Sequence, residues 1–373
     1  MKKNLLEDVT PTLLMGPGPS CVSPATYHAL ALPTLGHLDP YFIEIMDGIK
    51  SGLRQLMGTK NEVTVPLSGT GSAGMEAAFV NTVEHGDKVL ILMNGVFGVR
   101  MAEVASRLGA EVEKLETEWG KVISLDEVKS KLDSSHYDIV AVVHAETSTG
   151  VRNPVDEIGK LVKAHGALYI VDTVTGLGGI PVKVDEWGAD VCYSGSQKCL
   201  SCPPGVAPIT FSENAMRKIN SRKQKVPNWY LDMTLLTQYW GGSKRVYHHT
   251  APINMMYGFY QAVFEILDEG MENVWERHAK THEYLVEKLE AIGIQFLVNK
   301  EDRLPMLNAV LIPEGVDEAA VRSRLLKEFH IEIGAGLGTL AGKVWRIGLM
   351  GHTARDYNVD RLVDALKVCI GIN

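Results

Sequence analysis

One lysine closes a polar loop directly after a pattern typical of a buried strand. Lys198 ends the segment Ser194-Gly195-Ser196-Gln197-Lys198, which follows the strand-like residues 189–194. A lysine that loses part of its hydration can become neutral, and a neutral amine attacks a carbonyl carbon. Most lysines are solvated surface residues. The apolar, constrained stretch 199–204 after Lys198 favours instead a candidate for a covalent bond to a carbonyl compound.

A glycine-rich turn at residues 68–74 is a candidate phosphate site. Its sequence, SGTGSAG, lies between the strand-like residues 63–65 and a helix expected to begin near Met75. Such a turn presents free backbone N–H groups and the positive end of a helix dipole to an anion. It is not a P-loop, because no Gly-Lys-Ser/Thr closes it, and it lacks the dinucleotide-binding pattern. Taken alone, it is equally consistent with an ordinary turn and helix cap.

Three further side chains lie in or just after strand-like segments. Asp172 ends an apolar run, where its carboxylate either acts on a bound group or caps the next turn. Arg346 lies in a short, otherwise apolar strand, so its charge needs either a substrate carboxylate or a neighbouring Asp or Glu. Phe97 follows an Asn-Gly pair, where its ring either covers a flat cofactor or joins the core.

The surrounding elements predict a mostly parallel sheet that brings these residues together. Short apolar runs alternate with amphipathic helical patterns along the first two thirds of the chain. We expect strands at 88–93, 111–115, 139–143, 167–171 and 189–194, and helices at 97–108 and 156–165. Strands separated by such helices imply right-handed βαβ crossovers. Ligands of open parallel sheets bind beyond the carboxyl ends of the strands, which is where the candidate residues follow.

The pattern changes near residue 255. We expect helices at 253–267, 272–292, 317–329 and 356–370, and strands at 294–298, 307–312, 331–333 and 344–349. This predicts a smaller α+β lobe, and 373 residues are more than one ordinary core needs. We therefore expect an N-terminal arm at 1–20, a large domain at 21–255 and a small C-terminal domain at 256–373.

The composition argues against several classes of protein. Hydrophobic residues make up 45% and charged residues 22% of the chain, as in a globular protein. The net charge of -8 and the lack of a long basic cluster argue against a nucleic-acid partner, and the basic residues in 217–225 are read as a solvated helix or loop. No stretch approaches 18 apolar residues, so we expect no membrane association.

The cysteines and the terminal segments lead us to expect a protein located inside the cell. Five cysteines in so long a chain do not form a disulfide framework pattern. Cys199 and Cys202 form a C-x-x-C, which we interpret as two small residues packed near a site, with a redox or zinc role as the alternative; no metal is expected. Residues 1–8 hold no apolar segment, and the final Gly371-Ile372-Asn373 is not a peroxisomal address. We expect a cytoplasmic location.

In chain order, these features resemble the class V aminotransferases, which bind pyridoxal 5′-phosphate (PLP). The similarity is close to the alanine–glyoxylate and serine–pyruvate group of that family, and it runs nearly end to end. The matching stretches are 15–20, 94–98, 144–150 (HAETSTG), 193–198, 247–250 (YHHT) and 346–349. The resemblance implies fold type I: a large domain with a mostly parallel seven-stranded sheet flanked by helices, and a smaller α+β C-terminal domain.

The resemblance also implies a role for each matching residue. Lys198 would hold the cofactor as a Schiff base and move the substrate's α-proton, and Asp172 would pair with the pyridine nitrogen. Arg346 would clamp the substrate carboxylate, with the backbone near Gly18 on the other side. The remaining cofactor contacts would be Thr70, Gly71, Ser72 and Gln197 at the phosphate, Thr147 near the ring hydroxyl, and Phe97 stacked on the ring. Tyr247 and Thr250 would reach the phosphate bound by the neighbouring subunit of a homodimer.

Some positions depart from the family pattern. Phe97 stands where close relatives often have tryptophan, and Thr70 and Thr147 stand where many have serine; stacking and the hydroxyl groups are kept. His37 and Asn254 lie where the family varies its substrate pocket. Relatives that use ureidoglycine place amides in that neighbourhood, and residues 36–40 are partly like theirs.

The resemblance implies ping-pong transamination from a small amino acid, alanine or serine, to glyoxylate or pyruvate, because only one arginine clamp is evident. The alternative is (S)-ureidoglycine–glyoxylate transamination. A PLP-binding protein without transaminase activity is a further alternative. A desulfurase is disfavoured because Cys369 lies in the terminal helix rather than on a mobile loop. A nicotinamide dehydrogenase is disfavoured by the missing dinucleotide fingerprint.

Overall fold

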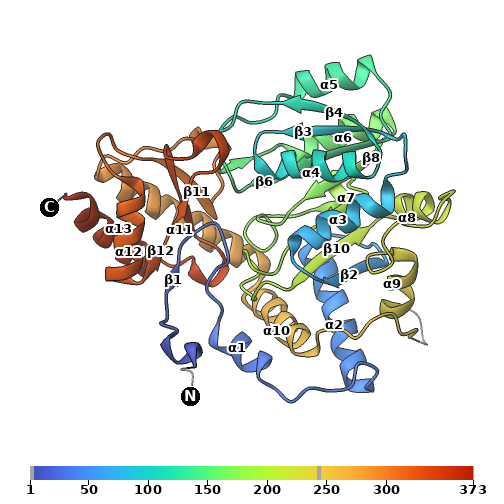
Figure 1. Ribbon diagram of the computed structural model, residues 1–373, viewed down its shortest axis with the longest axis horizontal. Helices are drawn as coiled ribbons and strands as arrows, with labels where there is room; N and C mark the ends of the chain where they lie inside the picture. The colour runs from blue at the N-terminus through green and yellow to red at the C-terminus, as the bar shows by residue number, and fades with distance from the viewer. Residues whose placement is uncertain (1–3, 242–244, 373) are drawn as a thin grey trace.

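The computed structural model describes residues 4–241 and 245–372 (Figure 1). Residues 1–3 and 373 lie outside the described residues. They belong to the two terminal segments on which the expectation of a cytoplasmic location partly rests. Within the described part, no helix combines the length and the apolar character needed to cross a membrane. Figure 1 shows a large lobe that holds the main sheet and, beside it, a small lobe built by the last third of the chain.

The large lobe is built on a mostly parallel seven-stranded sheet, which confirms the expected fold class. Its strands, in spatial order, are β2 (Val63–Ser68), β10 (Val206–Phe211), β9 (Val191–Tyr193), β8 (Leu168–Asp172), β5 (Ile139–Val143), β3 (Lys88–Met93) and β4 (Glu111–Glu116). Only β10 runs antiparallel to its neighbours. Strands β5 and β8 are buried along their whole length, which explains why they read as unbroken apolar runs rather than alternating ones.

Helices cover this sheet and connect its parallel strands. They are α1 (Pro24–Leu30), α2 (Pro40–Leu56), α3 (Gly71–Thr82), α4 (Val96–Arg107), α5 (Leu125–Ser134), α6 (Val155–His165), α7 (Val184–Trp187), α8 (Glu213–Asn220), α9 (Met233–Trp240) and α10 (Ile253–Glu269). Helix α6 illustrates the local cause: it begins after Pro154, carries Asp156 and Glu157 in its first turn, and has Lys163 and His165 in its last turn. These charges complement the helix dipole at both ends.

The small lobe is an α+β unit, as expected. A three-stranded antiparallel sheet has the order β11 (Leu307–Leu311), β14 (Val344–Gly348) and β13 (Gly334–Ala335). Helices α11 (Met271–Ala291), α12 (Glu318–Phe329) and α13 (Asp356–Ile370) pack with it. The N-terminal arm joins this lobe, because β1 (Leu13–Leu14) pairs with β12 (Ile331–Glu332). Short elements complete the fold: the hairpin β6 (Ala145–Glu146) and β7 (Val151–Arg152), and the 3-10 helices η1 (Leu5–Asp8), η2 (Lys300–Asp302), η3 (Gly338–Leu340) and η4 (Gly351–Thr353).

The strand expected at 294–298 is not formed. The Leu297 N–H donates to the Ala309 carbonyl at 2.9 Å, and the Leu311 N–H donates to the Gln295 carbonyl at 2.7 Å. Only Phe296 and Val310 form a bridged pair. The segment therefore runs along the edge of β11 without a regular ladder.

The expected domain boundary at residue 255 falls inside helix α10. This helix packs against α1 and α2, and its buried residues Met256, Phe259 and Val263 join the core of the large lobe. The small-lobe core instead draws on α11 to α13 and on the arm residues Leu13 and Met15. We propose that the small lobe begins at Gly270, between α10 and α11.

Candidate active site

Lys198 lies in the loop that follows β9, at the carboxyl edge of the sheet. Its side chain is only 8% exposed, and its Nζ donates a hydrogen bond to the Pro17 carbonyl of the N-terminal arm. Burial, together with the charge of the nearby Arg346 guanidinium, lowers the pKa of this amine to about 8. A substantial fraction of the amine is therefore neutral at mildly alkaline pH, as nucleophilic attack on a carbonyl requires.

The arm approaches the Lys198 amine closely at Gly18. This residue has φ +100, and a Cβ atom there would lie 2.6 Å from Lys198 Nζ. Only glycine combines that backbone conformation with that approach. The structure thus places Gly18 beside the lysine, and its expected position opposite Arg346 at the substrate carboxylate stays a prediction.

Asp172 ends β8, the strand next to β9, and its carboxylate is buried. Its Oδ1 accepts a hydrogen bond from the Val174 N–H at 2.8 Å, whereas Oδ2 has no partner among the described residues. Burial raises the pKa of this carboxyl to about 7, while the Val174 N–H opposes the rise, as does the nearby Tyr193 phenol, which itself forms no hydrogen bond with a described residue. A buried unpaired carboxylate oxygen is costly, and a protonated pyridine nitrogen is a donor that fits it. This orphaned oxygen is the observation on which the site fits PLP.

The glycine-rich turn meets the Lys198 loop. Helix α3 begins at Gly71, and a Cβ on Gly71 would lie 3.6 Å from the Gly195 Cα. The N-cap residue Thr70 makes no side-chain capping bond, and Thr70 and Ser72 are both exposed. Free N–H groups at the start of a twelve-residue helix suit a phosphate. The Gln197 Oε1 is buried without a partner among the described residues, and the NH2 of the same amide is the group that can donate to an anion.

Arg346 is buried without a carboxylate partner. Its Nε donates to the Ala335 carbonyl at 2.7 Å and its Nη1 to the Thr147 carbonyl at 3.3 Å. No ion pair to an Asp or Glu involves it within residues 4–241 and 245–372, so the salt-bridge alternative is not found. Burial lowers the pKa of the guanidinium to about 10, and Glu146 opposes that shift. A buried arginine held only by carbonyl oxygens retains donors for a carboxylate ligand.

Glu146 is a further candidate site residue, which no sequence pattern had indicated. Its carboxylate is fully buried and accepts hydrogen bonds from the Phe97 N–H at 3.2 Å and from the Ser148 N–H and Oγ at 3.0 and 2.6 Å. It lies at the N-terminus of α4, where a negative charge is favoured. Burial raises the pKa of this carboxyl. Its only signal in the sequence was one acidic residue within a small, polar loop after a buried strand.

Phe97 and Thr147 lie near these groups. The Phe97 ring is half-buried and carries the Arg100 guanidinium 4.9 Å from its centre. Thr147 is buried, and its Oγ1 lies 3.0 Å from the Thr175 Oγ1. Stacking of the Phe97 ring on the cofactor stays a prediction, and the Thr147 hydroxyl already has one hydrogen-bond partner.

Four of the expected residues are not brought to Lys198 by the described part of this chain. Tyr247 is 56% exposed, its hydroxyl lies 3.3 Å from the Thr250 Oγ1, and its ring packs 5.0 Å from the His37 ring. The Asn254 amide donates to the Leu30 and Leu32 carbonyls at 3.0 and 2.7 Å. Asn254 therefore holds the chain that follows α1, and no contact links this group of residues to Lys198, Asp172 or Arg346.

Cys199 and Cys202 are buried thiols beside the Lys198 loop. No disulfide joins them, and burial raises the pKa of each thiol to about 12. Protonated, desolvated thiols are poor nucleophiles and poor metal ligands. Among the described residues, no cluster of His, Cys, Asp and Glu is arranged to hold a metal ion.

Comparisons with known proteins agree on one family. The aminotransferase class-V family model matches residues 25–362. An alanine–glyoxylate aminotransferase of Rattus norvegicus is 40% identical over 358 residues, which cover 95% of this chain and 86% of that protein. An (S)-ureidoglycine–glyoxylate transaminase of Bacillus subtilis is 38% identical, with 93% and 87% covered. The crystal structure of an alanine–glyoxylate aminotransferase from Nostoc sp. superposes with a TM-score of 0.95 at 49% identity, over 99% of this chain and all of the other.

Proposed function

This chain belongs to the class-V aminotransferase family and is a PLP-dependent aminotransferase, and on that premise we propose that it transfers the amino group of alanine or serine to glyoxylate or pyruvate. The observation that supports a small donor is the buried Arg346, which has no carboxylate partner in the described chain and lowers the pKa of Lys198. One guanidinium matches one α-carboxylate.

A donor with a second carboxylate would call for a second cation in the pocket. Arg100 influences the electrostatic potential at Lys198, but it is exposed and lies over the Phe97 ring. An exposed guanidinium binds an anion weakly compared with a buried one, because water competes for both groups. This supports monocarboxylate donors with small side chains.

The residues of the site would divide the work of transamination among them. PLP, bound covalently through Lys198 between turnovers, supplies the electron sink for the bond that is broken at the substrate α-carbon. Asp172 Oδ2 would pair with the cofactor's protonated ring nitrogen, and the first turn of α3 with Gln197 would hold its phosphate. Arg346 would bind the substrate carboxylate and so orient the substrate beside the amine of Lys198. The Lys198 Nζ would accept the α-proton of the substrate and later give it back.

The homodimer is a second part of the proposal. Tyr247 and Thr250 are exposed, their hydroxyls are paired, and among the described residues no hydrogen bond joins either of them to this chain's own Lys198. We propose that they complete the phosphate site of the neighbouring subunit, with amino acids and 2-oxo acids as the small-molecule partners. The cytoplasmic location stays a prediction.

Transamination of (S)-ureidoglycine is the second candidate. It is supported by the similarity to the Bacillus subtilis transaminase for that substrate, whose crystal structure superposes with a TM-score of 0.95 at 39% identity. His37 and the chain around it lie near the exposed Tyr247, where a second subunit would meet them. Asn254 is weaker support, because its amide is already held by backbone carbonyls.

One experiment tests both levels of the proposal. The purified protein is expected to show a visible-edge absorption band that Lys198→Ala abolishes. Adding alanine, serine and ureidoglycine singly, with glyoxylate or pyruvate, is expected to give turnover with alanine or serine. A colourless protein, or a band unchanged in Lys198→Ala, contradicts the assigned role of Lys198. Turnover with ureidoglycine alone moves the function to the second candidate.

A further inference from the structure

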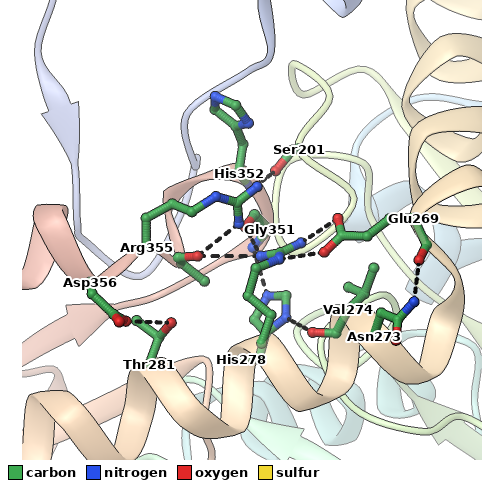
Figure 2. Close-up of polar contacts among 12 residues, drawn as sticks. Ser201, Glu269, Asn273, Val274, His278, Thr281, Gly351, His352, Arg355 and Asp356 are labelled. Carbon is green, nitrogen blue, oxygen red and sulfur yellow. Dashed lines mark hydrogen bonds and ion pairs between the residues drawn. The ribbon is translucent and has the colours of Figure 1, made fainter.

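A segment of the small lobe lies directly against the turn that follows Lys198 (Figure 2). Gly351 begins the 3-10 helix η4 with φ +54, and a Cβ atom there would collide with the Ser201 Oγ and the Cys199 carbonyl oxygen. The His352 N–H donates to the Ser201 Oγ at 2.7 Å. Segment η4 of the small lobe and the turn of the large lobe are thus in contact at Ser201, which lies three positions after Lys198 in the chain.

The turn itself has an unfavourable conformation that needs outside support. Ser201 has φ +51, in the left-handed region that costs a residue with a side chain conformational energy. Within the loop, the Ser201 N–H donates to the Lys198 carbonyl at 3.1 Å. The same carbonyl accepts a bond from the Ser20 Oγ at 2.7 Å. The position of the Lys198 backbone therefore depends on Ser201 staying in this conformation, which the His352 N–H stabilises.

His278 on α11 holds the other side of this contact. Its Nδ1 lies 2.7 Å from the Val274 carbonyl, and a carbonyl only accepts, so Nδ1 carries the proton. Its Nε2 is therefore free to accept a hydrogen bond from the Gly351 N–H, which lies 2.9 Å away. The ring is fully buried, and burial lowers its pKa to about 4, so it stays neutral and keeps this tautomer. Figure 2 shows the His278 ring between Val274 and Gly351.

The neighbouring residue on the same helix fixes the Gly351 carbonyl. Arg277 pairs with Glu269 through Nε and Nη2 at 2.5 and 2.8 Å, and its Nη1 donates to the Gly351 carbonyl at 2.9 Å. Both polar groups of Gly351 are thus bound by consecutive residues of α11. The end of α10, which belongs to the large lobe, is tied to them through Glu269.

We propose that His278 is a positioning residue for the Lys198 amine, acting through the Gly351 N–H and the turn at Ser201. This inference rests on the proposed role of Lys198 and goes beyond it, because it assigns a function to a side chain outside the cofactor site. The chain of contacts runs from His278 Nε2 to Gly351, from η4 to the Ser201 Oγ, and from Ser201 to the Lys198 carbonyl.

Two variants separate this role from simple packing. In His278→Gln, the side-chain oxygen reaches the position of Nε2 and keeps an acceptor for Gly351. In His278→Asn, the side-chain amide reaches the position of Nδ1 and keeps a donor for Val274 but leaves Gly351 without its acceptor. Each variant removes one of the two hydrogen bonds, so a purely structural role predicts similar effects of both.

The readout is the ionisation of Lys198 rather than turnover. In the full-length protein freed of cofactor, the Lys198 pKa follows from the pH dependence of its acetylation, measured by mass spectrometry of the Lys198 peptide. We expect His278→Asn to raise this pKa by about 1 unit, because a loosened turn admits water, and His278→Gln to leave it near the wild-type value. In the cofactor-loaded protein, the pH midpoint of the visible band is expected to shift in His278→Asn alone.

Equal shifts in both variants, or none in either, overturn the inference. If His278→Asn does not fold, Ser201→Ala removes the acceptor for the His352 N–H at the other end of the contact and is expected to give the same rise. The proposed function fails separately: in that case the visible band of the wild-type protein does not depend on Lys198 at all.

Discussion

At the scale of single residues, burial acts in opposite directions on the two central ionisable groups. It lowers the pKa of the Lys198 amine to about 8 and raises that of the Asp172 carboxyl to about 7. Burial therefore destabilises the charged form of each group until a partner binds. The ring nitrogen of PLP is the matching partner for Asp172, and a carbonyl carbon is the matching partner for a neutral lysine.

Arg346 allows a test of substrate binding at this scale. Arg346→Gln keeps hydrogen-bonding groups near the Ala335 and Thr147 carbonyls but removes the charge. Because a charge-assisted bond to a carboxylate is lost, kcat/KM for alanine is expected to fall by about 10- to 100-fold, mainly through KM. Steady-state kinetics with alanine and glyoxylate measure this. An unchanged KM would show that the carboxylate is bound elsewhere.

The residues found from the sequence are those whose role follows from strand order. Asp172 ends β8 and Lys198 follows β9, and these two strands are neighbours in the sheet. Because ligands of parallel sheets bind beyond the carboxyl ends of the strands, both residues could be expected at one site. Glu146 was missed because its role depends on the Phe97 and Ser148 N–H groups, which no spacing reveals. Asn254 was placed in the pocket, yet its amide serves the chain after α1.

At the scale of elements, Glu146 links a loop to the start of α4. Glu146→Gln keeps the size of the side chain but removes its charge and turns an amide donor toward the Phe97 or Ser148 N–H groups. The free energy of unfolding is expected to fall by about 1–3 kcal/mol, because buried donors lose a charged acceptor at a helix N-terminus. Urea unfolding followed by circular dichroism measures it.

The matched control for that experiment is Glu103, which lies on α4. Glu103 forms an exposed i,i+4 ion pair with Arg107 at 2.7 Å, so Glu103→Gln changes the same group to the same amide in solvent. Its effect is expected to stay within about 0.5 kcal/mol. Equal losses of unfolding free energy in the two variants would mean that the buried Glu146 carboxylate stabilises the protein no more than the exposed Glu103 carboxylate does.

Elements differ in how far a sequence pattern determines them. Strands β3, β5 and β8 were predicted because an unbroken apolar run in a parallel sheet is buried on both faces. Residues 294–298 have a similar apolar character, but a strand needs a continuous ladder, and here only two backbone bonds reach β11. Helix α10 was predicted correctly, yet periodicity alone does not tell which of two cores receives its apolar face.

At the scale of the whole molecule, the fold buries certain histidines and thereby favours their neutral form. His278 and His144 are both buried, and burial lowers their pKa values to about 4 and 3. Between those values and the ordinary value of 6.5, the unfolded chain binds protons that the folded chain does not. The contribution of each ring to stability is therefore complete above pH 6.5 and is lost as the pH falls. Asp172 acts with the opposite sign between 3.8 and about 7, because its carboxyl holds a proton longer in the folded state.

Comparison of His278→Gln with the wild-type protein isolates one of these groups. The charged groups that face His278 are Glu269, Arg277 and Arg355, and they are unchanged in the variant. Between pH 6.5 and about 4, the wild type is expected to lose about 3 kcal/mol more unfolding free energy than the variant, since 2.5 pKa units correspond to that amount. Denaturant unfolding at pH 4, 5, 6, 7 and 8 measures the two slopes. Because a neutral amide takes up no proton, the variant's curve should be flatter below pH 6.5 and parallel to the wild type above it. Parallel curves throughout would mean that the His278 ring takes up its proton at the same pH in the folded and the unfolded protein, and the Gly351 N–H would then lose its acceptor below pH 6.5.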